Sequence, residues 1–376
     1  MKLKKYVKDI KNQPNMDGIF LVTVFVLLTI GLVMLFSASY ANALYYHDDS
    51  MYFIKRQAIF AVIGVAMMLG ISFIDYHIFK KLTLPIFAIA FFLLIIVLFM
   101  PSEKGITRWI NLGFMQFQPS EVMKFAIILL FALLISNNYS KMGTFTYGVM
   151  MLAIPLGAVC VLMLLQPHLS GLILIGSIGA TMMFVGGTKY RWFALLVAAA
   201  IAAVAAIIIF KGVGYAMGRI NGWIDPMSDP SDTTFQTYQS LLSIGSGGLM
   251  GLGFGNSRQK YLYLPEPQND FIFAIVCEEL GFIGAILIIG LFILFIFRGF
   301  AIATKAKDKF GMLVAVGITA QIGLQALLNI GVVSNAIPNT GISLPFFSYG
   351  GTALVMQLCE IGVLLNISRQ AILEKE

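Results

Sequence analysis

The chain has 376 residues, of which 59% are hydrophobic and only 11% are charged, and its mean hydropathy is +0.88. Soluble domains carry about 25% charged residues, so this composition excludes an ordinary soluble protein and predicts an integral membrane protein. The formal net charge of +7 would suggest nucleic acid as a partner of a soluble protein. Here most of the excess cations lie at the ends of apolar runs, so we expect no nucleic acid and assign the charge to membrane topology.

Ten apolar runs of membrane-spanning length, taken in chain order, predict an all-α, polytopic fold. In a bilayer every backbone polar group must be satisfied within its own segment, so such runs are predicted to be helices. The ten predicted transmembrane helices cover residues 19–39, 58–74, 82–100, 121–136, 146–165, 169–187, 192–211, 271–297, 311–334 and 345–367. We expect one membrane domain over 19–367, flanked by tails at 1–18 and 368–376, with a large extracellular loop at 212–270 between the seventh and eighth helices.

Lysine and arginine are distributed unevenly between the two sides of the predicted bundle, which orients it by the positive-inside rule. With a cytoplasmic N-terminus, 16 of the 25 cations lie on the cytoplasmic side, and 9 lie on the outer side or in the adjoining helix ends. Both termini and both tails are therefore predicted in the cytoplasm. The loops before the fourth, sixth, eighth and tenth helices, which carry the most unusual sequence, then face outward.

The segment LPEPQNDFIFA places two acids at the outer end of the eighth predicted helix. Asp270 stands where an Asp would cap that helix and stabilise it by about 1 kcal/mol, so capping is one interpretation. Glu266 lies between Pro265 and Pro267, which restrict the backbone and give this loop a defined shape. A rigid acidic loop at a membrane surface favours a functional site centred on Asp270.

Glu278 and Glu279 lie deeper in the same predicted helix. At about 100° per residue they point roughly 80° and 180° away from Asp270 if the helix is continuous, so the three acids cannot share one face. A carboxylate at that depth faces protein or a water-filled cavity. Structural pairing and a direct chemical role are both compatible with this position.

Two pairs of cations accompany the acids on the predicted outer side. Arg108 and Lys124 flank the outer end of the fourth helix, where Lys124 either extends toward the surface or pairs with an acid on a neighbouring helix. Arg258 and Lys260 follow GLGFG, which imitates a nucleotide-binding motif but follows no predicted strand, so we reject a nucleotide site. Each pair is either a solvated patch or a diphosphate site, for which Arg offers a fork of donors and Lys a point charge.

A second irregular segment is predicted to break the ninth and tenth helices near the outer face. Its helix-breaking residues are Asn329, Gly331, Pro338, Gly341 and Pro345, followed by the turn that begins at Ser348. Irregular backbone at membrane depth is tolerated only where it is buried in protein or lines a cavity. We expect this segment to close the same outward cavity and Ser348 to contribute to substrate binding.

Three motifs, taken together and in this order, resemble the SEDS family (shape, elongation, division and sporulation) of bacterial membrane proteins. They are TRWINLGFMQFQPSE, then GLGFGNSRQKYLYLPEPQNDFIFAIVCEELGFIG, then NIGVV with PNTGISLPFFSYGG. The resemblance covers nearly the whole chain, and the sequence around SRQK, LPEPQ and GVLLNISR is closer to the FtsW and SpoVE branch than to the RodA branch. The chain departs from the family pattern at His168, where QPDLG is usual, and at Thr352-Ala353, where SYGGSS is usual.

The resemblance implies a peptidoglycan glycosyltransferase of the bacterial cytoplasmic membrane that polymerises lipid II on the outer face. It implies a class B penicillin-binding protein as the crosslinking partner, together with other division or sporulation membrane proteins. It carries the family's essential acid onto Asp270 and its functional arginine onto Arg108.

The chemistry of this reaction assigns roles to the remaining residues. Joining two diphosphate-linked sugars needs a base for the attacking hydroxyl and positive charge for the departing diphosphate. We assign Asp270 as the general base, Glu266 either to positioning that base or to holding a divalent cation (Mg²⁺ or Mn²⁺), and to the diphosphates Arg108, Lys124, Arg258 and Lys260. Two other classes stay open: a lipid II flippase or transporter, and a noncatalytic scaffold for division proteins.

Overall fold

The computed structural model of the chain describes residues 16–100, 108–111, 113, 116–194, 198, 222–229 and 234–371. In this part of the chain eight helices are long and apolar enough to cross a membrane. They are α2 (Gly18–His47), α3 (Tyr52–Ser72), α4 (His77–Val97), α5 (Pro119–Asn137), the continuous stretch of η2 (Thr146–Met150) and α6 (Met151–Leu165), α11 (Ile272–Thr304), α12 (Lys309–Val333) and α13 (Gly351–Gln370). The shorter apolar helix α7 (Leu169–Val185) has 17 residues, and η1 (Tyr139–Lys141) is a single turn.

The predicted all-α membrane fold is confirmed. The expected transmembrane helix at 192–211 lies almost wholly outside the described residues, as do parts of the expected loop at 212–270, so the number of ten spans stays a prediction.

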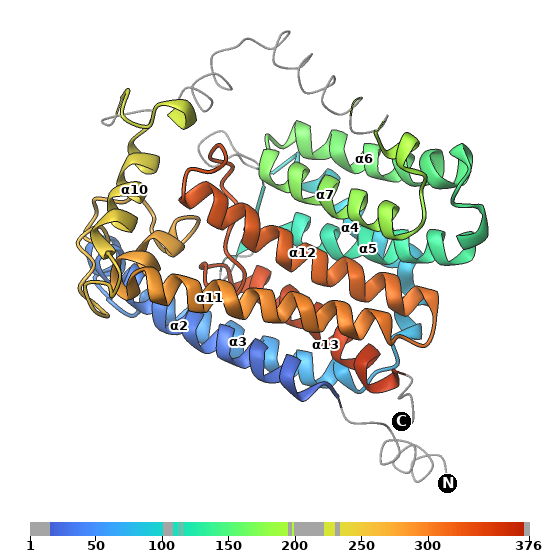
Figure 1. Cartoon of the computed structure of the whole chain (residues 1–376), viewed down its shortest axis with the longest axis horizontal. Coiled ribbons are helices and arrows are strands. Elements are labelled where there is room, and N and C mark those ends of the chain that lie inside the picture. The colour runs from blue at the N-terminus through green and yellow to red at the C-terminus, as the bar shows by residue number, and fades with distance from the viewer. Residues whose placement is uncertain are drawn as a thin grey trace.

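The helices form an elongated bundle with α12 in its middle (Figure 1). α12 packs against α5, α7, α11 and α13, and both α5 and α12 bury most of their residues. α2 and α3 pack along α11 and α13 on one side, whereas α4, α6 and α7 cover the other side. The two central helices therefore contact protein rather than lipid, and polar side chains on them can be satisfied inside the bundle.

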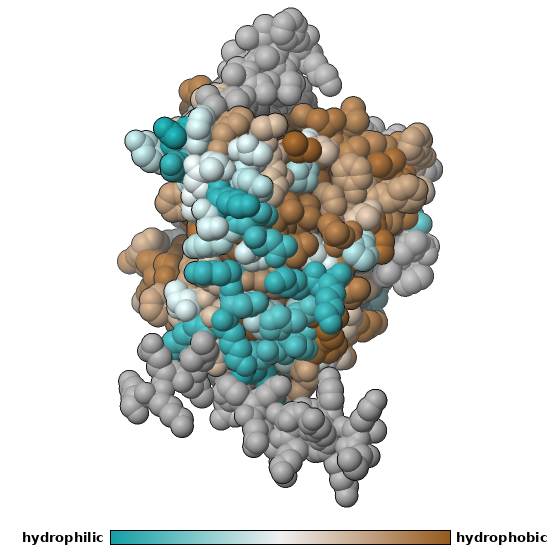
Figure 2. Space-filling view, turned by 90° about the vertical axis from the view of Figure 1, so that its right-hand side faces the viewer, coloured by the Kyte–Doolittle hydropathy of each residue, from teal (hydrophilic) through white to brown (hydrophobic). Residues whose placement is uncertain are grey.

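The two described ends of the chain lie at the same end of the bundle (Figure 1). Asp17 caps α2 by accepting a hydrogen bond from Phe20 N–H at 2.9 Å, its own N–H donates to Ser368 Oγ at 3.2 Å, and its carboxylate pairs with Arg298 of α11. Figure 2 views the bundle from this side and shows a hydrophilic band between hydrophobic flanks. The exposed cations at this end include Lys81, Lys141, Lys189, Lys307 and Lys309.

Several helices begin or end away from the boundaries that hydropathy predicts. α2 continues from residue 39 to His47, where Asp48 closes it in a left-handed conformation with φ 53°, and α3 begins at Tyr52 rather than at 58. α13 begins at Gly351 rather than at 345, because the preceding SLPFFSYG (residues 343–350) is not helical. Hydropathy marks the apolar length of a helix, so it misses polar and aromatic turns that project beyond the apolar run.

The described residues between 108 and 118 include a small hairpin that the sequence did not predict. Strand β1 (Ile110–Asn111) pairs antiparallel with β2 (Gln116–Phe117), with Ile110 opposite Phe117. Gly113 in the connection has a φ of 84°, which favours glycine. The hairpin leads directly into Pro119 at the first turn of α5 and so fixes where Arg108 lies.

The eighth predicted helix, α11, is not continuous. Gly281 has φ 67° and ψ −169°, and the loop after α10 (Phe235–Gly247) fits into the break. The carbonyls of Glu278 and Glu279 accept from the N–H groups of Leu252 and Gly253 at 2.9 and 3.0 Å, while two N–H groups beyond the break donate back to this loop. A Cβ at Gly281 would lie 2.2 Å from Gly251 N, so GLGFG serves a close backbone contact and not a nucleotide.

Candidate active site

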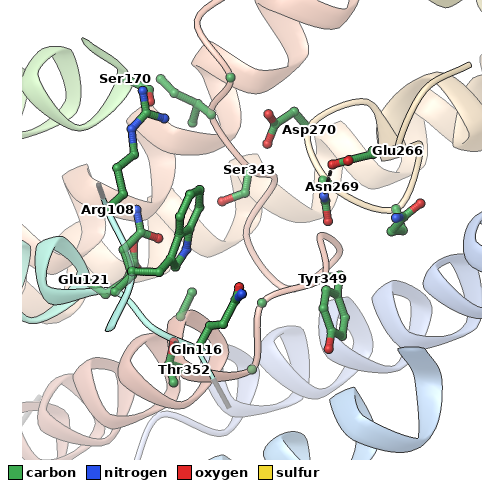
Figure 3. A pocket seen from close by; sticks show the side chains of 18 of the residues that line it. Arg108, Gln116, Glu121, Ser170, Glu266, Asn269, Asp270, Ser343, Tyr349 and Thr352 are labelled. Atoms are coloured by element: carbon green, nitrogen blue, oxygen red, sulfur yellow. Dashed lines mark hydrogen bonds between the residues drawn. The ribbon is translucent and has the colours of Figure 1, made fainter. Parts of the chain in front are cut away.

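A cavity of about 1150 Å³ opens at the end of the bundle opposite the termini. Its walls come from the α2–α3 connection, the hairpin before α5, the start of α7, the loop before α11 and the segment before α13. Four of the predicted catalytic and substrate-binding residues line it: Arg108, Lys124, Glu266 and Asp270. Figure 3 shows that Arg108 and the loop carrying Glu266, Asn269 and Asp270 lie on different sides of this space.

The backbone on both sides of Asp270 is held by the segment before α13 and by α12. Asn329 Nδ2 donates to Asp270 O at 2.7 Å and to Ile342 O at 2.7 Å, and Asn329 is fully buried. Ser348 Oγ donates to Asn269 O at 2.6 Å, and Tyr349 N–H donates to Gln268 O at 2.8 Å. The two irregular segments that the sequence predicted to share a cavity are therefore fastened together, and Asp270 is held rigidly at their junction.

The Asp270 carboxyl is partly buried and faces the cavity, and it does not cap α11. The residue at the cap position is Phe271, and no side chain caps the first turn. A Cβ at Gly341, whose φ is 70°, would lie 3.2 Å from Asp270 Oδ2, so a glycine leaves room for the carboxyl. Burial and the nearby Glu266 carboxylate raise the pKa of Asp270 to about 6, while Arg108 opposes the rise. An acid with this pKa is a suitable general base near neutral pH.

Arg108 and Lys124 both line the cavity but have different interaction partners. The Arg108 guanidinium donates to Pro167 O and is close enough to Asp270 to affect its ionisation. Lys124 is buried, and its Nζ lies 2.8 Å from Glu121 Oε2 and 3.3 Å from Gln325 Oε1. Among the described residues, Lys124 therefore neither extends to the surface nor pairs with an acid of a neighbouring helix within ion-pair distance; its partner is Glu121, one turn earlier in its own helix.

His168, which departs from the family pattern, is a buried cavity residue at the start of α7. Burial and the nearby cations Arg108 and Lys124 lower the pKa of His168 to about 3. The imidazole is therefore neutral, and it adds a hydrogen-bonding group to the cavity without adding charge.

Three predicted substrate contacts do not face this cavity. Lys260 is 3% exposed, and its Nζ contacts Glu279 Oε1 at 3.0 Å, Gly255 O at 2.6 Å and Ser37 Oγ at 3.1 Å. Arg258 is exposed and lies outside the cavity walls. Ser348 lines a smaller adjoining pocket, and its hydroxyl already bridges Leu344 N and Asn269 O. The structure places the Lys260 side chain away from this cavity, which the sequence could not show because a residue's place in a loop does not give the direction of its side chain.

Glu278 and Glu279 are structural partners of the loop that precedes α11. Ser257 Oγ and Arg258 N–H donate to Glu278 at 2.5 and 2.9 Å. Glu279 accepts from Ser37 and Lys260, as well as from Ser257 N–H at 3.3 Å. These contacts join α2, α11 and the loop at the break in α11, and they satisfy two carboxylates that would otherwise be costly to bury.

The sequence reasoning missed the wall that α2 and α3 contribute. It includes Asn42, Tyr46, His47, Tyr52, Phe53 and Arg56. Arg56 was counted only as an outer-side cation, because hydropathy ended the first helix at residue 39 and began the second at 58. The clustering of aromatic residues in YYHDDSMYF was the signal that could have found it.

The carboxylates of this cavity do not form a preassembled metal cage. No group of three His, Cys, Asp or Glu side chains able to hold a metal ion occurs among the residues that the structure describes. Glu266 and Asp270 nevertheless line the same cavity. One or two carboxylates are what Mg²⁺ takes from a protein when substrate phosphates supply other ligands.

Comparison with known proteins places nearly the whole chain in one family. The FtsW/RodA/SpoVE family profile, described as "Cell cycle protein", matches residues 18–372. Stage V sporulation protein E of Bacillus subtilis is 43% identical over 359 residues, which cover 94% of this chain and 97% of that protein. A Geobacter protein named "Probable peptidoglycan glycosyltransferase FtsW" is 38% identical over 356 residues, covering 94% of this chain and 96% of that protein.

Two solved structures share the fold of this chain. A chain from work described as "Structural coordination of polymerization and crosslinking by a peptidoglycan synthase complex" matches with a TM-score of 0.78 and 26% identity, covering 94% of this chain and 98% of that chain. The rod shape determining protein RodA of Thermus thermophilus matches with a TM-score of 0.70 and 25% identity, covering 95% of this chain and 97% of that chain.

Proposed function

Since this chain belongs to the FtsW/RodA/SpoVE family, we propose that it is a peptidoglycan glycosyltransferase that polymerises lipid II during cell division or sporulation. The observation that carries this proposal is a rigidly held carboxyl, Asp270, whose pKa is raised to about 6 and which faces a large cavity beside Arg108. The cavity opens at the end of the bundle opposite the termini, where the lipid tail of a substrate can stay in the bilayer while its sugars reach the acid.

Asp270 acts as the general base. Its carboxylate takes the proton from the attacking sugar hydroxyl as that oxygen bonds to the anomeric carbon of the second substrate. The bond from the anomeric carbon to the diphosphate breaks, and the electron pair leaves with the diphosphate. Direct displacement at an α-linked carbon inverts the configuration to β, and no covalent intermediate with the enzyme forms.

Arg108 stabilises the negative charge that develops on the departing diphosphate. Its guanidinium can donate two parallel hydrogen bonds to diphosphate oxygens. Lys124 lies in the same cavity but is engaged by Glu121, so it contributes positive potential at longer range. Glu266 raises the pKa of Asp270 and thereby tunes the base.

Glu266 and Asp270 are the residues that would hold a divalent cation, Mg²⁺ or Mn²⁺, together with diphosphate oxygens. Such a cation would supply further charge neutralisation at the leaving group. Titrating EDTA and then Mg²⁺ or Mn²⁺ into a polymerisation assay tests this assignment, and a Glu266→Gln variant should shift the cation concentration required.

The exposed cations at the termini end support a cytoplasmic location for both termini in the bacterial cytoplasmic membrane. The cavity then faces outward, where a class B penicillin-binding protein can crosslink the emerging strand. The structural neighbour from a peptidoglycan synthase complex that coordinates polymerisation and crosslinking supports this partner, and other division or sporulation membrane proteins would recruit the pair.

Incubating the purified chain with lipid II, alone and with its transpeptidase partner, tests the proposed function. Glycan strands resolved by gel electrophoresis are the expected product, and they should disappear with Asp270→Asn. Transport of lipid II between vesicle leaflets without polymer would favour a flippase. If neither polymer nor transport is seen even with the partner present, the result would favour a noncatalytic scaffold for division proteins.

A further inference from the structure

The cavity has a second cationic wall, built by α3 and the turn before α13. Arg56 lines the cavity, and its guanidinium carbon lies 4.1 Å from the centre of the Tyr52 ring. The rings of Tyr52 and His47 are stacked with centroids 3.7 Å apart, and Phe53 meets Tyr349 edge to face at 4.9 Å. Stacking on an aromatic ring restricts the orientation of an arginine guanidinium while leaving its charge and its N–H donors available.

Arg56 has no carboxylate within ion-pair distance in the described part of the chain. Its neighbour Lys55 differs, because Lys55 Nζ pairs with Asp49 at 2.8 Å and Lys55 is not among the residues that line the cavity. The Arg56 guanidinium instead lies near the Tyr349 hydroxyl, where it opposes the rise in the pKa of Tyr349 that burial causes. A cavity-facing arginine without a carboxylate partner is suited to receive an anionic ligand.

Two features on the same side of the cavity as Arg56 add hydrogen-bond donors and one hydrogen-bond acceptor. Residues Gly350 to Ala353, at the N-terminus of α13, line the cavity, and no side chain caps this helix end. The turn is fixed by Gln57, which is fully buried and accepts from Gly350 N–H at 3.2 Å. Gln268 also lines the cavity, is 3% exposed, and its Oε1 accepts no hydrogen bond from the described residues.

This part of the cavity combines hydrogen-bond donors and positive charge with one acceptor that lacks a donor among the described residues. A ligand that carries both a diphosphate and a sugar would satisfy all three. The helix N-terminus and Arg56 suit phosphate oxygens, while the Gln268 carbonyl oxygen suits a sugar hydroxyl or amide N–H. A buried acceptor without a donor costs free energy, which a ligand donor can recover.

We propose that this acceptor wall, defined as Tyr52, Arg56, Gln268, Tyr349 and the N-terminus of α13, binds the diphosphate and adjoining sugar of the second lipid-linked substrate. This inference rests on the proposed function. Polymerisation joins two molecules that each carry a diphosphate, but only the donor loses it. The attacking hydroxyl belongs to the acceptor's outer sugar, so the acceptor's own diphosphate lies a disaccharide away from Asp270. Arg108 serves the departing diphosphate, and Arg56 serves the one that stays bonded to its sugar.

Counting bound diphosphate lipids tests the proposal without relying on catalysis. Native mass spectrometry of the purified full chain with farnesyl diphosphate should show two bound copies for wild type, two for Lys55→Ala, and one for either Arg56→Ala or Arg108→Ala. Arg56→Lys should retain the second copy at reduced affinity. The Lys55→Ala control removes one cation from the same helix outside the cavity. A single copy on wild type, or two copies of unchanged affinity on Arg56→Ala, would overturn the proposal.

Kinetics then separates the acceptor from the donor. Loss of a charge-assisted contact typically weakens binding about tenfold or more, so Arg56→Ala should raise the lipid II concentration for half-maximal elongation by at least about tenfold. Its rate at saturation should stay within about threefold of wild type, whereas Arg108→Ala should lower that rate. The reverse pattern would refute the assignment. Failure of wild type to make polymer would instead refute the proposed function. The number of diphosphate lipids bound would still test the acceptor wall in that case.

Discussion

Replacing Asp270 with Asn removes the proposed base while keeping the size of the side chain. General base help is typically worth about 100-fold to 10,000-fold, so Asp270→Asn should lower the polymerisation rate by that factor. The pKa of Asp270 is raised to about 6 by burial and by Glu266. The wild-type rate should therefore rise with pH as the carboxyl ionises, reach half its limit near the pKa, and level off about one unit higher.

The same substitution makes an opposite prediction for stability. The folded-state pKa of Asp270, about 6, lies above its ordinary value of 3.8, so the folded chain favours the protonated form. Burial of the charged carboxylate therefore costs stability above the folded pKa, and this cost disappears as the pH falls toward the ordinary value. Asp270→Asn should unfold at the same or a higher temperature than wild type at about pH 8.

Glycan polymerisation and thermal unfolding should be measured on the same detergent-purified samples across this pH range. Asp49→Asn is the matched control, because Asp49 is an exposed acid in the α2–α3 connection and lies outside the cavity walls. Activity of Asp270→Asn within a few-fold of wild type would remove Asp270 as the base. A lower unfolding temperature with Asn would show instead that the carboxylate has a structural role.

Four further outcomes are expected. Arg108→Lys should retain more activity than Arg108→Ala, since a point charge replaces a fork only in part; equal rates of both variants and wild type would leave Arg108 an interfacial anchor. Lys260→Met should destabilise the fold by about 3–5 kcal/mol by leaving its carboxylate partner buried and unpaired, and unfolding unchanged from wild type would contradict this. Gly281→Ala should lower the yield of folded protein, because backbone occupies the space of a Cβ. Ser228→Cys should react with an impermeant thiol reagent from outside and Lys307→Cys only from inside; the opposite labelling would invert the topology.

The sequence predicted the part of the site that depends on local composition. Asp270, Glu266 and Arg108 lie in short segments whose acids, prolines and breaks in hydropathy are visible along the chain, and the structure brings these segments to one cavity. The sequence did not show that Lys260 pairs with Glu279 outside the cavity, because Glu279 meets the loop only at the break in α11. That break follows from a close backbone contact between two distant glycines, which no local pattern shows.

Arg56 was overlooked for a different physical reason. A hydropathy window detects the part of a helix that lies in hydrocarbon, and the last turns of α2 and the first turn of α3 are aromatic and polar. Those turns extend beyond the apolar part of each helix. They carry the α2 and α3 residues that line the cavity. In a membrane enzyme the chemistry is placed where the apolar signal stops, so boundaries that hydropathy truncates are where site residues are most readily missed.

The interrupted helix explains why a chain of this kind keeps two buried carboxylates outside its catalytic cavity. A continuous α11 would satisfy its own backbone and offer no free backbone groups to the loop after α10. The break instead exposes carbonyls and N–H groups that pair with the loop after α10, and the Glu278 and Glu279 side chains hold the following residues up to Lys260. The start of the loop that leads to Asp270 is thereby fixed to α11, while Asn329 holds the Asp270 carbonyl at the other end of that loop. Such anchoring at both ends would keep the proposed base in position during turnover.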